Sequence, residues 1–262
     1  MDRTENRTRT ATVPIATSRA MSAVMTTSWF VEHTEYPPTY ATFEPLVNGE
    51  RTFGALYDDI LAATQSVDIV CWGFQPSMYF KRDNDGSLCI GDLLLLKASE
   101  GVKVRILCWS DSLRIAALFS ENMTPGRNLA SVLKPGFQTS EQIKYDRRWH
   151  WHATDSSLRL TPFTQLKIAH RIKALLTDDP FANIEFVTRD FGLANRAEIF
   201  WHVALHAKDD DRGLITRLSS AAAMTVEPTH HQKMVLIDYA VPDKAVGFLM
   251  GHNTLDAYWD RD

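Results

Sequence analysis

The sequence has few cysteines, and their positions fit no common metal or disulfide framework. The three cysteines, Cys71, Cys89 and Cys108, are an odd number and lack zinc-ligand spacing. Cys71 and Cys108 fall inside apolar runs of the kind that form buried strands, and buried free cysteine behaves as a small apolar side chain. We therefore expect free, buried thiols.

The sequence also lacks a long apolar run. The longest continuous leucine run is Leu93 to Leu96, far short of the roughly 18 apolar residues that a membrane span needs. The first residues are rich in Thr, Arg and Ser and contain no apolar core of a signal peptide. We interpret residues 1–42 as a mobile Thr/Arg-rich leader. We expect a soluble protein whose contact with lipid would be peripheral.

A strong basic excess is missing as well. The formal net charge is −4 at pH 7, whereas proteins that wrap nucleic acid rely on many Lys and Arg to displace counterions. We therefore expect no nucleic-acid partner, although a local basic site stays open. With 262 residues, 45% of them hydrophobic, the chain has enough apolar material for a substantial core. We assign residues 43–262 to one domain.

Apolar periodicity in this domain alternates between helix and strand. In residues 51–65, for example, Phe53, Leu56 and Ile60 fall on one helical face. Crossovers of a dozen or more residues between strands indicate an α/β fold, with a parallel or mixed sheet flanked by helices on both faces. Residues 124–145 are expected to be irregular. The predicted helices cover residues 51–65, 91–100, 161–176, 193–207 and 214–223, and the predicted strands cover 67–74, 102–109 and 184–187.

The chemistry-bearing stretch lies near the end of the chain, at residues 230–238. His231 and Lys233 are two residues apart in an apolar run, and side chains at i and i+2 of a strand share a face. An imidazole beside an ammonium suits attack on a phosphodiester, because the charge on the phosphoryl oxygens must be neutralised during attack. His230 would point to the other face. Asp238, five residues beyond Lys233, would also face away, which favours a fold-holding role unless the strand ends first.

The spacing H-x-K-x-x-x-x-D, followed by Met250-Gly251-His252-Asn253, resembles the signature of the phospholipase D superfamily, whose second segment reads G-[SG]-x-N. Asn253 is in register, and Met250 stands where the family often has Gly. Residues 95–109 also resemble the family run L-L-x-x-A-x-x-G-V-x-V-x-x-L-x-W. The resemblance implies a phospholipase D-like fold.

The resemblance also implies a mechanism. His231 would attack phosphorus and form a phosphohistidine, Lys233 and Asn253 would bind the phosphoryl oxygens, and Asp238 would complete the catalytic motif. Metal and cofactor are not expected, because Lys233 and its counterpart supply the positive charge. The substrate class is phospholipid at a membrane surface.

A narrower likeness is to the bacterial phospholipase D effectors of type VI secretion. It is carried by residues 43–49, 72–80, 230–233 and 251–260. It implies synthesis in a bacterial cytoplasm, secretion without a cleavable signal peptide, and action in a target cell. Secretion-machinery and immunity proteins would then be partners.

The chain contains one such motif, whereas the family's active site is assembled from two. His206 is followed by Lys208, but Gly213 stands where Asp is required. A single imidazole cannot be both phosphorylated and the acid for the same step. We expect the domain to be the first half of a two-motif enzyme, truncated before the second half. The alternatives are a nuclease formed by two copies of the chain, and an inactive one-motif remnant.

A cluster of aromatic and basic residues lies at 147–152. Its His150 and His152 form an H-x-H pair, but no third metal ligand has an obvious spacing. We interpret Trp149, His150, Trp151 and His152 as a rim or lid near the phosphate site, with a packed surface as the alternative.

Overall fold

The computed structural model groups the chain into two units, Met1–Pro45 and Leu46–Asp262. It describes residues 10–13, 23–26, 41–82, 86–110, 138–154, 180–206, 219, 221–222, 224–225 and 228–261. In the first unit, β1 (Thr10–Val13) pairs antiparallel with β2 (Ala23–Thr26). The sequence pattern of this segment predicted no strand.

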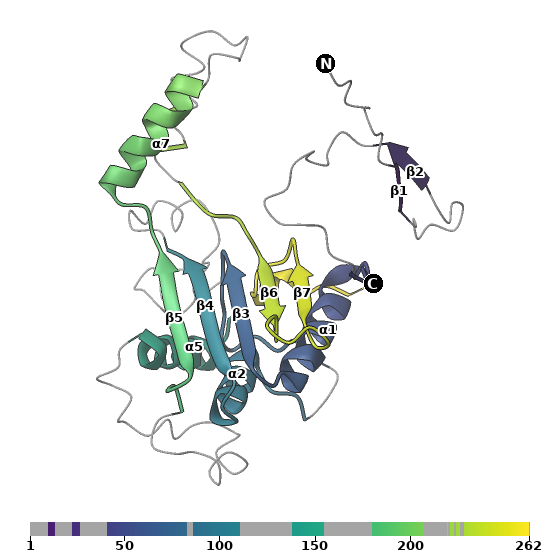
Figure 1. Ribbon diagram of the computed structural model, residues 1–262. Helices are drawn as coiled ribbons and strands as arrows, with labels where there is room; N and C mark the ends of the chain where they lie inside the picture. The colour runs from purple at the N-terminus through teal and green to yellow at the C-terminus, as the bar shows by residue number, and fades with distance from the viewer. Residues whose placement is uncertain are drawn as a thin grey trace. The chain divides into compact units, whose positions relative to one another are not determined.

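The second unit is built on an open sheet of five strands in the order β5-β4-β3-β6-β7 (Figure 1). Strands β3, β4 and β5 are parallel, while β6 runs antiparallel to β3 and β7 antiparallel to β6. The predicted α/β fold with a mixed sheet is therefore confirmed. The strands are β3 (Ser66–Cys71), β4 (Lys103–Trp109), β5 (Ile184–Arg189), β6 (Met234–Ile237) and β7 (Val246–Leu249).

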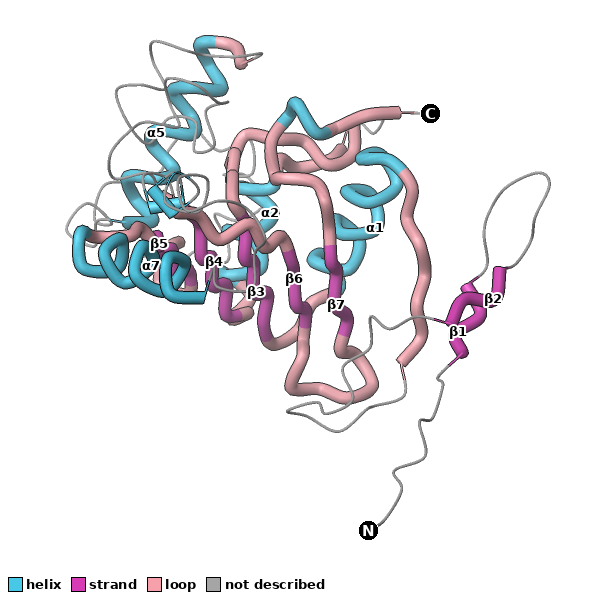
Figure 2. The backbone as a smooth tube through the Cα atoms, turned by 90° about the horizontal axis from the view of Figure 1, so that it is seen from above, coloured by secondary structure: helices cyan, strands magenta, loops and turns pink. Residues whose placement is uncertain are grey.

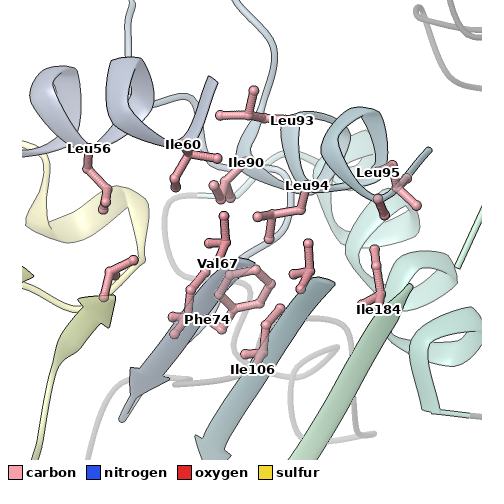
Figure 3. Close-up of a cluster of buried hydrophobic side chains, with 14 of the residues drawn as sticks. Leu56, Ile60, Val67, Phe74, Ile90, Leu93, Leu94, Leu95, Ile106 and Ile184 are labelled. Carbon is pink, nitrogen blue, oxygen red and sulfur yellow. The ribbon is translucent and has the colours of Figure 1, made fainter. Parts of the chain in front are cut away.

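Three helices, α1 (Asn48–Ala62), α2 (Ile90–Ser99) and α5 (Ser140–Thr154), lie on one side of the sheet (Figure 2). The expected helices on the opposite face are not seen among the described residues. Apolar side chains of α1 and α2 face those of the strands across this interface (Figure 3). Fully burying one such aliphatic side chain contributes about 1.5–3 kcal/mol. Helix α7 (Leu193–His206) extends beyond the end of β5 (Figure 1).

Side chains of β4 alternate between the two faces of the sheet. In β4, Val104 and Ile106 are buried against the helices, while Lys103 is exposed on the opposite face. Helix α2 ends where Gly101 adopts φ +90°, a conformation that glycine reaches without a Cβ clash. The three free cysteines are all buried, which confirms the expectation.

The C-terminal segment caps helix α1. The backbone N–H of Glu50 donates to the carbonyl of Asp260 at 2.9 Å, and the N–H of Gly49 donates to the Asp260 carboxylate. A Cβ at position 49 would lie 2.5 Å from the Tyr258 carbonyl oxygen, so this close approach requires glycine. These contacts fix residues 258–260 against the start of the domain.

Helix α5 corrects two expectations. Residues 140–145 are helical rather than irregular, and the H-x-H pair lies on the same helix. Trp149, His150 and His152 are buried, so these three side chains cannot form an exposed rim or lid. The Trp149 ring lies 5.4 Å from the ring of Phe74, within the core. Trp151 alone of the four is exposed.

The predicted helix at 161–176 lies outside the described residues, as does most of the one at 214–223. None of the helices in the described ranges has the length and apolarity to cross a bilayer.

Candidate active site

The predicted pair of His231 and Lys233 meets in the structure. Lys233 Nζ lies 3.0 Å from His231 Nε2 and donates to the His231 carbonyl oxygen at 3.3 Å. Both residues precede β6 in an extended segment rather than lying within the strand. The imidazole is exposed and the lysine side chain is buried, so the ammonium reaches the surface at the histidine ring.

Two tryptophan rings pack beside His231 and Lys233. The Trp72 ring lies edge-on to the His231 ring at 5.0 Å, and Lys233 Nζ lies 5.8 Å from the Trp72 ring centroid. Trp72 packs at 5.3 Å against Trp109, whose indole N–H donates to the Pro228 carbonyl at 3.3 Å. Trp72 and Trp109, at the carboxyl ends of β3 and β4, thus form an aromatic surface next to the histidine and lysine. Neither tryptophan was predicted from the sequence to contribute to the site.

Burial lowers the pKa of Lys233, and the nearby Cys71 thiol opposes this effect only in part. A lowered pKa means that the positive charge is destabilised by its surroundings. A bound anion would stabilise the same charge by Coulombic attraction and a charge-assisted hydrogen bond. The position therefore favours an anionic group next to Lys233.

His230 occupies a different environment from His231. Both of its ring nitrogens are enclosed, and neither has a hydrogen-bond partner within the described ranges. Burial lowers the pKa of His230, and the positive charges of Arg189 and Lys233 lower it further. These surroundings therefore favour the neutral form of the His230 ring. It is the Nε2 atom of His231 that lies beside the Lys233 ammonium.

Asp238 follows β6 directly, in a left-handed conformation with φ +47°. Its Oδ1 accepts the backbone N–H groups of Gln65 (2.7 Å) and Ser66 (2.9 Å), and its Oδ2 accepts the N–H and hydroxyl of Thr64 (both 2.8 Å). Burial would raise the pKa of Asp238, but these hydrogen bonds outweigh it and lower the pKa to about 2.

These bonds give Asp238 the fold-holding role that strand parity favoured. Strand β6 separates it from Lys233, a span of about 16 Å at the usual strand rise. The structure therefore does not bring Asp238 to the histidine and lysine. Asp238 instead holds the end of β6 against residues 64–66.

Asn253 lies in the loop after β7 and is 1% exposed. The Gly73 N–H donates to its Oδ1 at 3.2 Å. Backbone bonds from Thr254 N–H to the Gly73 carbonyl (3.2 Å) and from Gln75 N–H to the Thr254 carbonyl (2.8 Å) join this loop to the one after β3. Asn253 is thus held beside the carboxyl end of β3, the end at which β6 begins.

No group of three His, Cys, Asp or Glu side chains within the described ranges is placed to hold a metal ion. His150 and His152 pack instead among aromatic rings, with His150 5.1 Å from Phe186 and His152 stacked at 5.6 Å on Phe181.

No protein-family model matches the chain. One segment of 82 residues is 33% identical to phospholipase D alpha 4 from Arabidopsis thaliana. The match covers 27% of this chain and 11% of the plant protein. This local similarity links the matched segment to the phospholipase D superfamily.

Proposed function

We propose that the chain carries a phospholipase D half-site that hydrolyses the phosphodiester bond of membrane phospholipids. The observation that carries the proposal is the 3.0 Å separation of Lys233 Nζ and His231 Nε2 at the surface. The local similarity to a plant phospholipase D supports the same chemistry.

The proposed reaction begins with an exchange of partners at Lys233. The ammonium, which donates to His231 Nε2 in the resting site, transfers this hydrogen bond to a phosphoryl oxygen. The Nε2 lone pair then attacks phosphorus, and the bond from phosphorus to the headgroup oxygen breaks as the nitrogen–phosphorus bond forms. Lys233 and the Asn253 amide stabilise the charge on the phosphoryl oxygens.

The departing headgroup oxygen takes a proton from an acid. Water then hydrolyses the phosphohistidine, which yields phosphatidic acid and regenerates His231. The acid cannot be His231, because its nitrogen is bonded to phosphorus. His150 and His152 are buried in the core, and His252 Nε2 lies 3.9 Å from the Asp260 carboxylate. We propose that a second phospholipase D half, or a second copy of the chain, supplies it.

A lipid substrate fits the surface near the site better than nucleic acid does. The net charge is −4, and helix α7 exposes Trp201 (62%) and Leu205 (56%). These residues are one helical turn apart, and α7 leaves the end of the sheet at which β6 begins (Figure 1). Indole rings favour the interface between lipid and water. We propose that α7 rests on the membrane while the site acts.

The biological setting we propose is delivery into a target cell by type VI secretion. Its support is the resemblance of residues 72–80 and 251–260 to such effectors. A growth assay tests it: the chain, with any second half encoded beside it, is directed to the periplasm or kept in the cytoplasm of a bacterial host. We expect compartment-dependent growth arrest that a co-encoded immunity protein relieves, and equal growth in all strains would contradict the setting.

The test of the activity is headgroup release. Vesicles of phosphatidylethanolamine or phosphatidylcholine are incubated with the chain, alone and with a second half, beside a plasmid-nicking assay. We expect headgroup release that His231→Ala abolishes and His230→Ala retains. Plasmid nicking without headgroup release would favour the nuclease formed by two copies, and inactivity of the folded protein in both assays would favour the one-motif remnant.

A further inference from the structure

The side chain of Gln75 joins the loop after β3 to the loop after β7, and we call this contact the loop junction. It is 2% exposed, and its amide makes three hydrogen bonds. Its Oε1 accepts the Asp256 backbone N–H at 3.0 Å, and its Nε2 donates to Asp256 Oδ2 at 2.7 Å and to Ser77 Oγ at 3.1 Å. A buried primary amide with both ends engaged has one preferred orientation, because the reversed amide would place donor against donor.

Asn253 is part of this loop junction. It is three residues before Asp256, and its own Oδ1 is held by Gly73, two residues before Gln75. The loop after β7 is thus fixed to the loop after β3 at Asn253 itself, at Thr254 and at Asp256. Displacing Asp256 from Gln75 would shift the backbone that carries Asn253.

Residues outside the two loops also bind the loop junction. Asp256 also accepts hydrogen bonds from Arg82 (2.8 Å) and from Gln142 of α5 (2.9 Å). Ser77 donates to Asp146 of α5 through its N–H and its hydroxyl. Helix α5 therefore holds both loops, and the Gln75 side chain adds direct bonds between them to the backbone bonds of Gly73 and Thr254.

We infer that Gln75, paired with Asp256, is a positioning residue that sets the placement of Asn253 at the phosphate-binding site. This inference rests on the proposed function for its kinetic readout, but the placement of Asn253 can be measured without turnover.

The test compares four variants in the full chain, assayed with the second half where turnover is measured. Gln75→Leu removes all three hydrogen bonds at similar size, and Gln75→Glu sets a carboxylate against Asp256. Gln75→Glu combined with Asp256→Asn restores a donor and acceptor pair with the direction reversed. Gln65→Leu makes the same chemical change at an exposed position and serves as the matched control.

We expect kcat to fall about 10²-fold for Gln75→Leu, the loss typical of a catalytic group displaced by about 1 Å. KM should change little, because Lys233 still binds the phosphate. Gln75→Glu should lose as much, the double variant should recover most of the loss, and Gln65→Leu should match the parent. This recovery separates a positioning role from a general loss of stability, and it applies even if Gln75→Leu does not fold.

The readout without turnover is the side-chain amide signal of Asn253 in a ¹H–¹⁵N spectrum, titrated with inorganic phosphate. We expect phosphate to move this signal in the parent and in the double variant, but not in Gln75→Glu. If the parent shows that response without any turnover, the proposed function fails while the positioning role stands. Parent-like kcat and an unshifted Asn253 signal in Gln75→Leu, or no response to phosphate in the parent, would overturn the inference.

Discussion

The ammonium of Lys233 lies 3.0 Å from Nε2 of His231, and the Trp72 ring packs next to both groups. The lysine can polarise a phosphoryl oxygen at the point where the histidine attacks. Lys233→Met should therefore remove charge stabilisation at the transition state and lower kcat by about 10²- to 10³-fold. The measurement is headgroup release, with His230→Ala as the neighbouring control. A Lys233→Met enzyme within a few-fold of the parent would exclude this role.

Asp238 should govern stability in acid. Its pKa is about 2 in the folded state, below its ordinary value of 3.8, so the folded state favours the ionised form. This contribution is fully present above about pH 4 and is lost as the pH falls from there towards 2. Asp238→Asn keeps one acceptor oxygen and loses the charge, which should cost about 2 kcal/mol at pH 7.

Urea unfolding of the parent and of Asp238→Asn at pH 7 and near pH 3 checks the sign. The gap between the two proteins should narrow near pH 3, because there the unfolded parent takes up a proton on Asp238 that the folded parent still excludes. A gap of constant size at both pH values would contradict the role of the charge.

Asp146 should act in the opposite direction. Burial raises its pKa to about 7, although the hydrogen bonds from Ser77 and Gln138 favour the charged form. Between about pH 4 and 7 the folded protein keeps a proton that the unfolded chain releases, so stability from this group falls as the pH rises. Asp146→Asn should therefore be less destabilising at pH 8 than at pH 5. A larger loss at pH 8 in urea unfolding would contradict the assignment.

Membrane contact through α7 can be tested with two exposed tryptophans. Trp201→Ala should weaken co-sedimentation with phospholipid vesicles, because the indole ring would leave the interface. Trp151→Ala, on helix α5 and 57% exposed, is the matched control and should bind as the parent does. Equal binding of both variants and the parent would remove α7 as the contact surface.

The elements that the sequence predicted well have a continuous apolar face. Helices α1 and α2 and strands β3 and β4 were located to within about three residues, because burial of one face dictates their periodicity. Helix α5 was missed for the opposite reason. Its buried face includes Asp146, His150 and His152, and Asp146 is held there by hydrogen bonds from Ser77, in the loop after β3. The local sequence of α5 does not reveal such partners from distant parts of the chain.

The same distinction applies to the candidate site. The proximity of His231 and Lys233 follows from a two-residue spacing, and it holds although β6 begins only at Met234. The contact between Gln75 and Asp256 joins positions 181 residues apart. Neither residue lies in a periodic segment, so only the folded arrangement of the two loops brings them together.

The most direct test of His231 as the nucleophile uses a phosphodiester with a p-nitrophenolate leaving group, which departs without a proton and so needs no general acid. The chain alone should release one equivalent of nitrophenolate in a burst and carry an acid-labile phosphoryl group on the peptide that contains His231, as mass spectrometry would detect. His231→Ala should show neither the burst nor the label. An unchanged burst in His231→Ala, or a phosphoryl group on another residue, would contradict the assignment of His231 as the nucleophile.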